Sequence, residues 1–254
     1  MSVIRVEVNK DKFASLPAAE QTLFLGVAHL YNEVNATTKL LYWAATTPTG
    51  TEAQDHGRLS LLLMLIQLLA GKLNEGWELF TKAYFGSVLS REFEPALDAS
   101  GREALQHLKR YFGKANEVNV IRNKFAFHYT PHELETVLPH VTEPLYAYME
   151  AGLAPNNLFF FSEAMTAQAL VRVLSSEVRT RSFEELVETL FEVAASFAIA
   201  SDAIMDAILT KSGHDLRVGQ PVEVVLSGPL DFRAVPVPWF TDTSGVDKVS
   251  LGSA

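Results

Sequence analysis

The chain of 254 residues carries 21 Lys and Arg against 30 Asp and Glu, a formal net charge of −9, and no cysteine. Its hydrophobic content of 48% is normal for a globular protein and excludes a disordered chain. The lack of cysteine excludes disulfides, thiol nucleophiles and Cys-ligated metal sites, and the acidic balance argues against a general DNA or RNA coat, which needs many phosphate-facing cations.

The N-terminal half predicts a short strand and two long helices. Residues 2–8 alternate instead of forming the apolar run of a secretory signal, so we expect a cytoplasmic protein. Apolar side chains recur at helical spacing over 18–45, and the cluster 47–50 ends that helix. A second helix is expected over 53–85. Its apolar run 59–70 is shorter than the roughly 20 residues of a membrane span, so we expect a central core helix and no membrane contact.

Capping signals divide the next part of the chain into further helices. Ser100, Thr130 and Ser182 each begin a pattern with Glu three residues later, which is typical of a capping box. With the glycine and proline breaks between them, these signals predict five helices, over 101–112, 117–128, 131–151, 161–177 and 182–210.

The pattern changes to extended structure after Gly213. Residues 222–226 have strand character, and three prolines follow within 229–238. The N-terminal strand 2–8 is the obvious pairing partner. The sequence therefore predicts an all-α fold, a bundle of long helices over 1–212, with a small β or extended appendage formed by the tail 213–254 and the N-terminal strand.

One window of basic side chains interrupts the acidic chain. Residues 101–130 hold six basic and two acidic side chains, a local net charge of +4. A solvated helix face is one interpretation. The other is a small cationic cleft, because the window also contains Arg122, Asn123 and His128 close together in sequence.

These three residues have complementary chemistry. Pro131 disfavours a helical Thr130, so the helix that carries Arg122 should end near His128. Arg122 is a permanent cation whose fork suits phosphate, and Asn123 can orient a neighbouring group by hydrogen bonding. A helix C-terminus favours the imidazolium form, which would tune His128 for proton transfer near neutral pH.

Arg122-Asn123 followed by His128 resembles the R-x(4–6)-H motif of the HEPN superfamily, whose members are all-α domains and often metal-independent endoribonucleases. The resemblance implies RNA cleavage by 2′-hydroxyl attack, without a cofactor. Arg122 would stabilise phosphate charge, with Asn123 beside it, and His128 would be general acid or base. It also implies a homodimer that brings two motifs into one cleft, and a setting in bacterial defence with an antitoxin-like protein partner. Candidate RNA-binding residues are Lys124, Tyr129, Lys114 and Arg110.

Other interpretations of the same residues stay open. Arg122 could pair with Glu117 or with an acid of 131–151, and His128 could cap its helix, which would leave a non-catalytic dimerisation, interaction or ligand-sensing module. His128 and His132 have the spacing of two metal ligands, but the Thr130-Pro131 break between them makes a metal site the weaker hypothesis. The acidic stripe 184–192 is expected to be a solvated face, and Asp55-His56 a helix cap.

Overall fold

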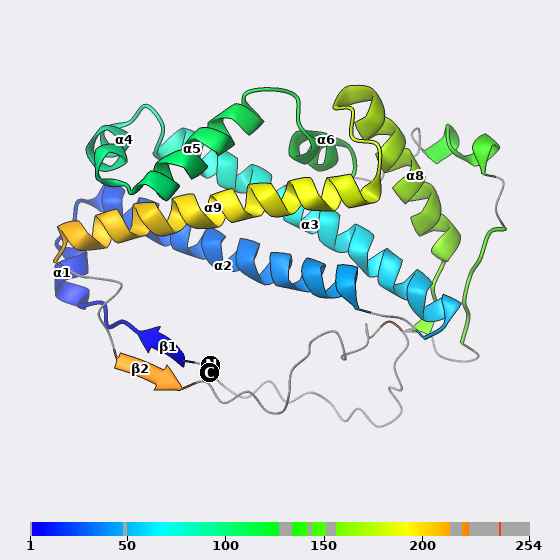
Figure 1. Cartoon of the computed structure of the whole chain (residues 1–254), viewed down its shortest axis with the longest axis horizontal. Coiled ribbons are helices and arrows are strands. Elements are labelled where there is room, and N and C mark those ends of the chain that lie inside the picture. The colour runs from blue at the N-terminus through cyan, green and yellow to red at the C-terminus, as the bar shows by residue number, and fades with distance from the viewer. Residues whose placement is uncertain are drawn as a thin grey trace.

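The computed structural model describes residues 2–47, 50–126, 134–141, 144–150, 156–213, 220–223 and 239. Its framework is three long helices: α2 (Ala18–Thr46), α3 (Glu52–Ala83) and α9 (Phe183–Lys211). They lie side by side along the long axis, and α3 returns antiparallel to α2 (Figure 1). This is the predicted all-α bundle, and the bounds of the first two helices differ from the predicted ones by one or two residues.

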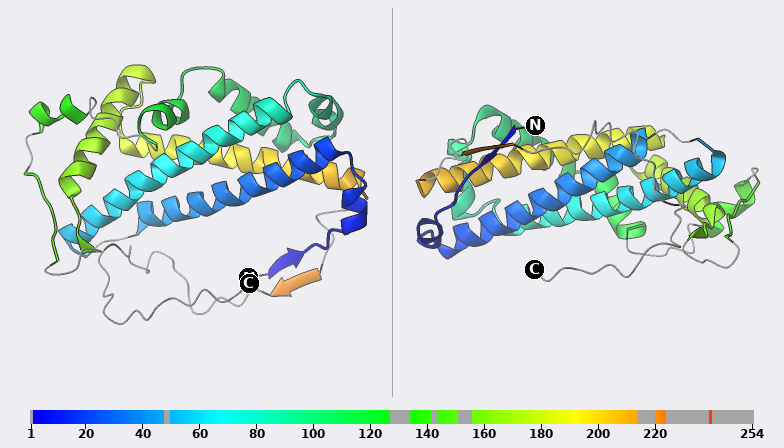
Figure 2. Two further views of the ribbon diagram at one scale, coloured as in Figure 1. Left: turned by 180° about the vertical axis from the view of Figure 1, so that it is seen from behind. Right: turned by 90° about the horizontal axis from the view of Figure 1, so that it is seen from below.

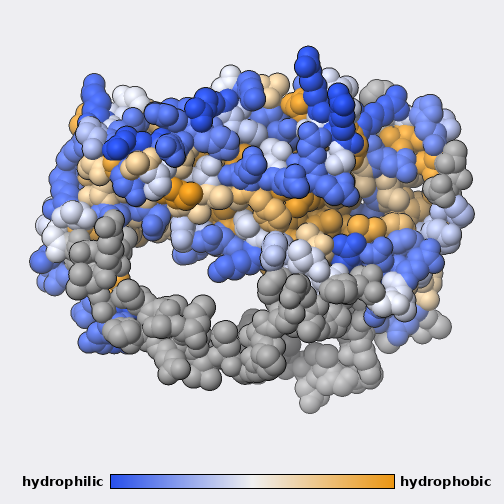
Figure 3. Space-filling view, in the orientation of Figure 1, coloured by the Kyte–Doolittle hydropathy of each residue, from blue (hydrophilic) through white to orange (hydrophobic). Residues whose placement is uncertain are grey.

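Shorter helices cover one face of this framework. They are α4 (Val88–Phe93), α5 (Ala99–Phe112) and α6 (Glu117–Lys124), with α8 (Phe160–Glu177) at one end of the bundle (Figures 1 and 2). Two 3₁₀ turns, Glu94–Ala96 and Leu138–His140, and the short helix α1 (Lys10–Ala14) are further described helical elements. Hydrophilic residues dominate the edge formed by α4, α5 and α6, and an apolar band follows α9 (Figure 3).

The two predicted strands pair as expected. The strand β1 (Ser2–Arg5) lies antiparallel to β2 (Gln220–Glu223), with Val3 opposite Val222. The guanidinium of Arg5 donates to the side chain of Gln220 at 2.9 Å. Beyond β2, Trp239 packs on α3, because a Cβ at Gly57 would lie only 2.7 Å from the Cβ of Trp239. A separate domain status for 213–254 stays a prediction.

The core is built where α3 meets α2, α5 and α9. Aromatic rings concentrate there: Trp77 stacks on Phe112 with centroids 4.7 Å apart, and Phe80 lies 5.5 Å from Phe197. Gly76 permits this approach, since a Cβ at that position would lie 2.7 Å from Leu30 and 3.0 Å from Phe197. The absence of a side chain at Gly76 therefore lets α2 and α9 pack closely against α3.

Two of the described helices, α3 and α9, are long and apolar enough to cross a membrane by length and composition alone. In the fold, 61% and 50% of their most apolar windows are buried. The core helices of a bundle pass the same test, because they are apolar on most sides.

Three predicted helix limits are wrong. The helix expected over 117–128 ends at Lys124. It ends there because the amides of Phe125 and Ala126 both donate to the carbonyl of Ile121, and the side chains of these two residues are buried in the core. The region 131–151 is not one helix, since residues 144–150 are not helical and Tyr148 among them forms a β-bridge with Leu158. The third limit is the start of α5, two residues earlier than predicted.

The helix caps show which signals were correct. Ser182 caps α9 as predicted and accepts from the amide of Glu185 at 3.1 Å. At α5 the cap is Asp98 instead of Ser100: its carboxylate accepts from the amide of Gly101 at 2.7 Å, and Ser100 donates to it. Thr130 lies outside the described residues.

Candidate functional site

The helix α6 that carries Arg122 is fixed at its start by a side-chain cap. Asn116, which is 1% exposed, accepts from the amide of Asn119 at 2.9 Å and donates to the carbonyl of Lys114 at 2.9 Å. The apolar side of α6, Val118 and Ile121, is fully buried, and α6 packs on α3. The opposite side is therefore presented to solvent.

Arg122 and Asn123 lie on that solvent side, near the C-terminal end of α6. The guanidinium of Arg122 donates to the side-chain oxygen of Asn123 at 3.1 Å. Its second terminal nitrogen is 3.9 Å from Glu75 of α3, and 45% of the Arg122 side chain is exposed. A long, exposed ion pair contributes little to stability, so the guanidinium can contact an incoming anion.

Glu117 does not pair with Arg122, so that alternative is wrong. Its carboxylate instead accepts from the hydroxyl of Tyr111 at 2.9 Å and from that of Thr180 at 2.7 Å. The Tyr111 hydroxyl also accepts from the amide of Val118 at 3.3 Å. Burial, and then the neighbouring Glu117, raise the pKa of Tyr111. We call Tyr111, Glu117 and Thr180 the α6 clamp, because they join the start of α6 to α5 and to the segment before α9.

The remaining predicted RNA-binding residues fall into two groups. Arg110 and Lys114 are exposed, and the described part of the chain shows no ion pair to either. Lys124 is half-buried and its ammonium is 2.5 Å from Glu177 of α8. The structure therefore brings Arg122 and Asn123 together and directs Lys124 to a different helix.

His128 and Tyr129 lie outside the described residues, as does His132 of the metal hypothesis. Within the described ranges no group of three His, Asp or Glu side chains could hold a metal ion. The acidic stripe is exposed as expected at Glu184, Glu185, Glu188 and Glu192.

Two features were not found from sequence. The α6 clamp needs three residues from separate segments, and only the Asn116 cap before Glu117 gave a local signal. His56 is not a cap: Thr51 caps α3, and the His56 ring stacks on Phe160 at 3.6 Å between centroids while its Nδ1 lies 2.8 Å from the Tyr148 hydroxyl.

Comparisons of the chain with protein-family models, with curated proteins and with solved structures find no match in any of the three. The function is therefore argued from the site alone.

Proposed function

We propose that this protein is a HEPN-like, metal-independent endoribonuclease. One observation carries the proposal: the Arg122 guanidinium is accessible, held by its neighbour Asn123 at 3.1 Å and paired only at long range, 3.9 Å, with the exposed carboxylate of Glu75 among the described residues. An arginine needed only for stability would more often be engaged at short range, as Arg58 is with Asp55 at 2.7 Å.

The proposed reaction is an intramolecular transesterification. The 2′-oxygen of the RNA forms a bond to the adjacent phosphorus and loses its proton to a base. The bond from phosphorus to the 5′-oxygen breaks, and that oxygen takes up a proton. The products are a 2′,3′-cyclic phosphate and a 5′-hydroxyl.

In this proposal each residue has one task. Arg122 stabilises the negative charge that develops on the non-bridging phosphate oxygens, and such a donor is worth about 10²–10³ in rate. Asn123 orients the guanidinium. His128 transfers a proton as general base or acid. Arg110, Lys114 and Tyr129 contact the flanking RNA, while Lys124 contributes less because Glu177 already neutralises it.

The two proton transfers of this reaction favour a dimer. One histidine cannot easily deprotonate the attacking hydroxyl and protonate the leaving oxygen on opposite sides of phosphorus. We therefore propose a two-fold homodimer with the residues Arg122, Asn123 and His128 of both copies near its axis. Sedimentation equilibrium measures this directly, and a monomer at assay concentration would contradict it.

The test is cleavage of a mixed-sequence RNA in excess chelator by wild type, Arg122→Ala and His128→Ala. We expect cleavage by wild type and a loss of about 100-fold or more in each variant. Arg91→Ala is the matched control, since Arg91 is an exposed arginine on α4, outside the basic window. Equal activity of wild type and Arg122→Ala would contradict the proposed site.

The second candidate is a non-catalytic interaction or ligand-sensing module. The observation that favours it is that the Arg122 guanidinium already contacts two side chains of its own chain, Asn123 and Glu75, in a protein of net charge −9. Absence of cleavage with every RNA tested would favour this candidate.

A further inference from the structure

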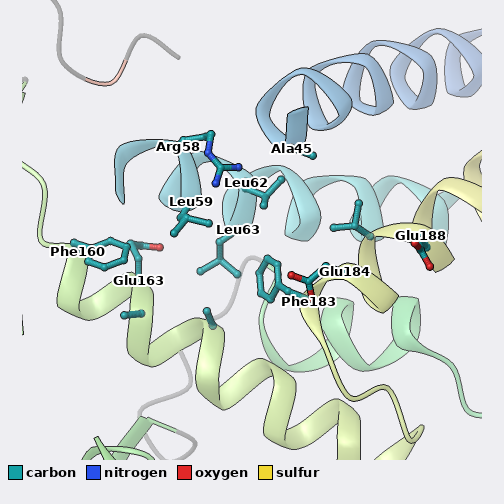
Figure 4. A pocket seen from close by; sticks show the side chains of 13 residues that line it. Ala45, Arg58, Leu59, Leu62, Leu63, Phe160, Glu163, Phe183, Glu184 and Glu188 are labelled. Carbon is teal, nitrogen blue, oxygen red and sulfur yellow. The ribbon is translucent and has the colours of Figure 1, made fainter. Parts of the chain in front are cut away.

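A cavity of about 550 Å³ (Figure 4) is lined by the start of α3, by α8 and by the start of α9, which lie at the end of the bundle opposite the strands (Figure 1). The cavity is also bounded, at Ala45, by the end of α2. Along α3, its residue Leu62 is about 20 Å from Glu75, the neighbour of Arg122, at the rise of an α-helix. The cavity is therefore separate from the proposed nuclease site, and its volume is in the range of small-molecule sites.

The walls of the cavity are apolar. Leu59 and Leu63 of α3 face Phe183 of α9 across it, and Phe160 closes one end. On α8, Ala164 and Ala167 follow Phe160 on the same side of the helix. Their side chains are small, so they do not fill the space that forms the cavity.

One aromatic wall is fixed before any ligand arrives. The Phe160 ring is stacked on His56 at 3.6 Å with an interplanar angle of 7°. His56 is held in turn by the hydroxyl of Tyr148, 2.8 Å from its Nδ1. A wall held in this way gives a ligand a preorganised surface, which lowers the entropy cost of binding.

The charges that line the cavity do not balance. The only lining cation among the described residues, Arg58, is already bound by Asp55 at 2.7 and 3.0 Å and by the carbonyl of Ala44 at 3.2 Å. Glu184 and Glu188 are exposed at the edge of the cavity. The cavity therefore has an acidic surplus.

The remaining lining acid is Glu163, on the same side of α8 as Phe160 and one turn further along, and it lies beside Phe160 (Figure 4). It is half-buried, and the described part of the chain gives its carboxylate no hydrogen bond or ion pair. Burial alone raises the pKa of Glu163. A partly desolvated carboxylate without a partner costs stability, and groups with perturbed pKa values cluster at functional sites.

We propose that this cavity binds a small hydrophobic organic cation, an ammonium group on an aromatic or aliphatic body, with the ammonium at Glu163. The apolar walls accept the hydrocarbon body, and the acidic surplus excludes carboxylates and phosphates. A divalent metal ion does not fit, because it requires several oxygen ligands together and the described residues contain no such group. Phe160 provides a ring close to the cation, an arrangement that adds attraction.

The experiment titrates the full chain with three probes of one shape: 3-phenylpropylammonium, 3-phenylpropanol and 3-phenylpropanoate. Dissociation constants come from NMR chemical-shift changes. We expect the ammonium to bind about 10-fold or more tightly than the alcohol, and the carboxylate most weakly. Equal binding of ammonium and alcohol, or no binding of the ammonium at millimolar concentration, would overturn the proposal.

Two variants locate the cation. Glu163→Gln keeps the shape of the side chain and removes its charge, so the preference for ammonium over alcohol should fall to about 2-fold or less. Glu103→Gln is the control, because Glu103 is an exposed acid on α5, outside the cavity. An unchanged preference in Glu163→Gln, with the variant folded by circular dichroism, would overturn the assignment of Glu163.

Discussion

Replacing Tyr111 by Phe removes one hydroxyl from the α6 clamp and leaves the ring in place. That hydroxyl donates to the Glu117 carboxylate at 2.9 Å and accepts from the amide of Val118 at 3.3 Å. Tyr111 is 9% exposed and Val118 is fully buried, so water cannot easily replace either bond. The variant should therefore loosen the start of the helix that carries Arg122.

The magnitude follows from the two bonds. A hydrogen bond to a charged group contributes about 1.5–3 kcal/mol, and a buried amide left without an acceptor costs about 1–3 kcal/mol. Thr180 still donates to Glu117 at 2.7 Å and compensates in part. We expect Tyr111→Phe to lower the free energy of unfolding by about 2–3 kcal/mol.

Urea denaturation followed by circular dichroism measures this change. Tyr31→Phe is the control, because Tyr31 packs against the core and its hydroxyl has no hydrogen bond among the described residues. The control should change stability by less than about 0.5 kcal/mol. A loss below about 1 kcal/mol in Tyr111→Phe would refute the α6 clamp. So would a double variant with Thr180→Val whose loss of stability equals the sum of the two single losses, because groups that share one carboxylate should couple.

Three further predictions test the packing and the charges. Gly76→Ala should lower the free energy of unfolding by about 1–3 kcal/mol, because the added Cβ overpacks the core. Gly26→Ala is the control: its Cβ would meet its nearest neighbour at 3.4 Å. In the same thermal unfolding assay this variant should raise the free energy of unfolding by up to about 1 kcal/mol through helix propensity. Lys211→Met should lower the free energy of unfolding by about 2–3 kcal/mol, because it removes the ion-pair partner of a buried acid. That acid, Glu20, is 2% exposed and lies 2.6 Å from the Lys211 ammonium. A loss below about 0.5 kcal/mol in urea denaturation would contradict this prediction. Glu163→Gln should stabilise the protein at pH 7, since the raised pKa of Glu163 means that the folded state favours the protonated acid and that this contribution to stability is lost as pH rises. The gain should vanish below about pH 4, where the acid is protonated in both states, in unfolding curves measured across pH.

The long helices were predictable because their signals are local. The apolar repeat from Leu23 to Leu41 and the Ser182 cap depend only on nearby residues, and both were confirmed. The end of α6 was not predictable in the same way. This helix ends where it does because Phe125 and Ala126 are buried. Their burial depends on the helices that pack around them, which the local sequence does not specify.

The candidate site was predictable only in part. Exposure of Arg122 and its bond to Asn123 agree with the proposed role, and adjacent residues make that bond easy to anticipate. The Lys124 pair with Glu177 spans 53 residues, and the cavity at Glu163 joins residues of four helices. Contacts of this range depend on the tertiary arrangement, about which a single sequence with no repeat pattern carries little information.

The most direct test of the nuclease proposal is the chemistry of the cleaved ends. Wild-type protein in excess chelator is incubated with an RNA oligonucleotide and with the same oligonucleotide carrying a single 2′-deoxy substitution at the preferred cleavage position, and the products are identified by mass spectrometry. The proposal predicts 2′,3′-cyclic phosphate and 5′-hydroxyl ends from the RNA, no cleavage at the substituted position, and loss of both products in Arg122→Ala. Cleavage at the 2′-deoxy position, or cleavage that disappears in chelator, would contradict it.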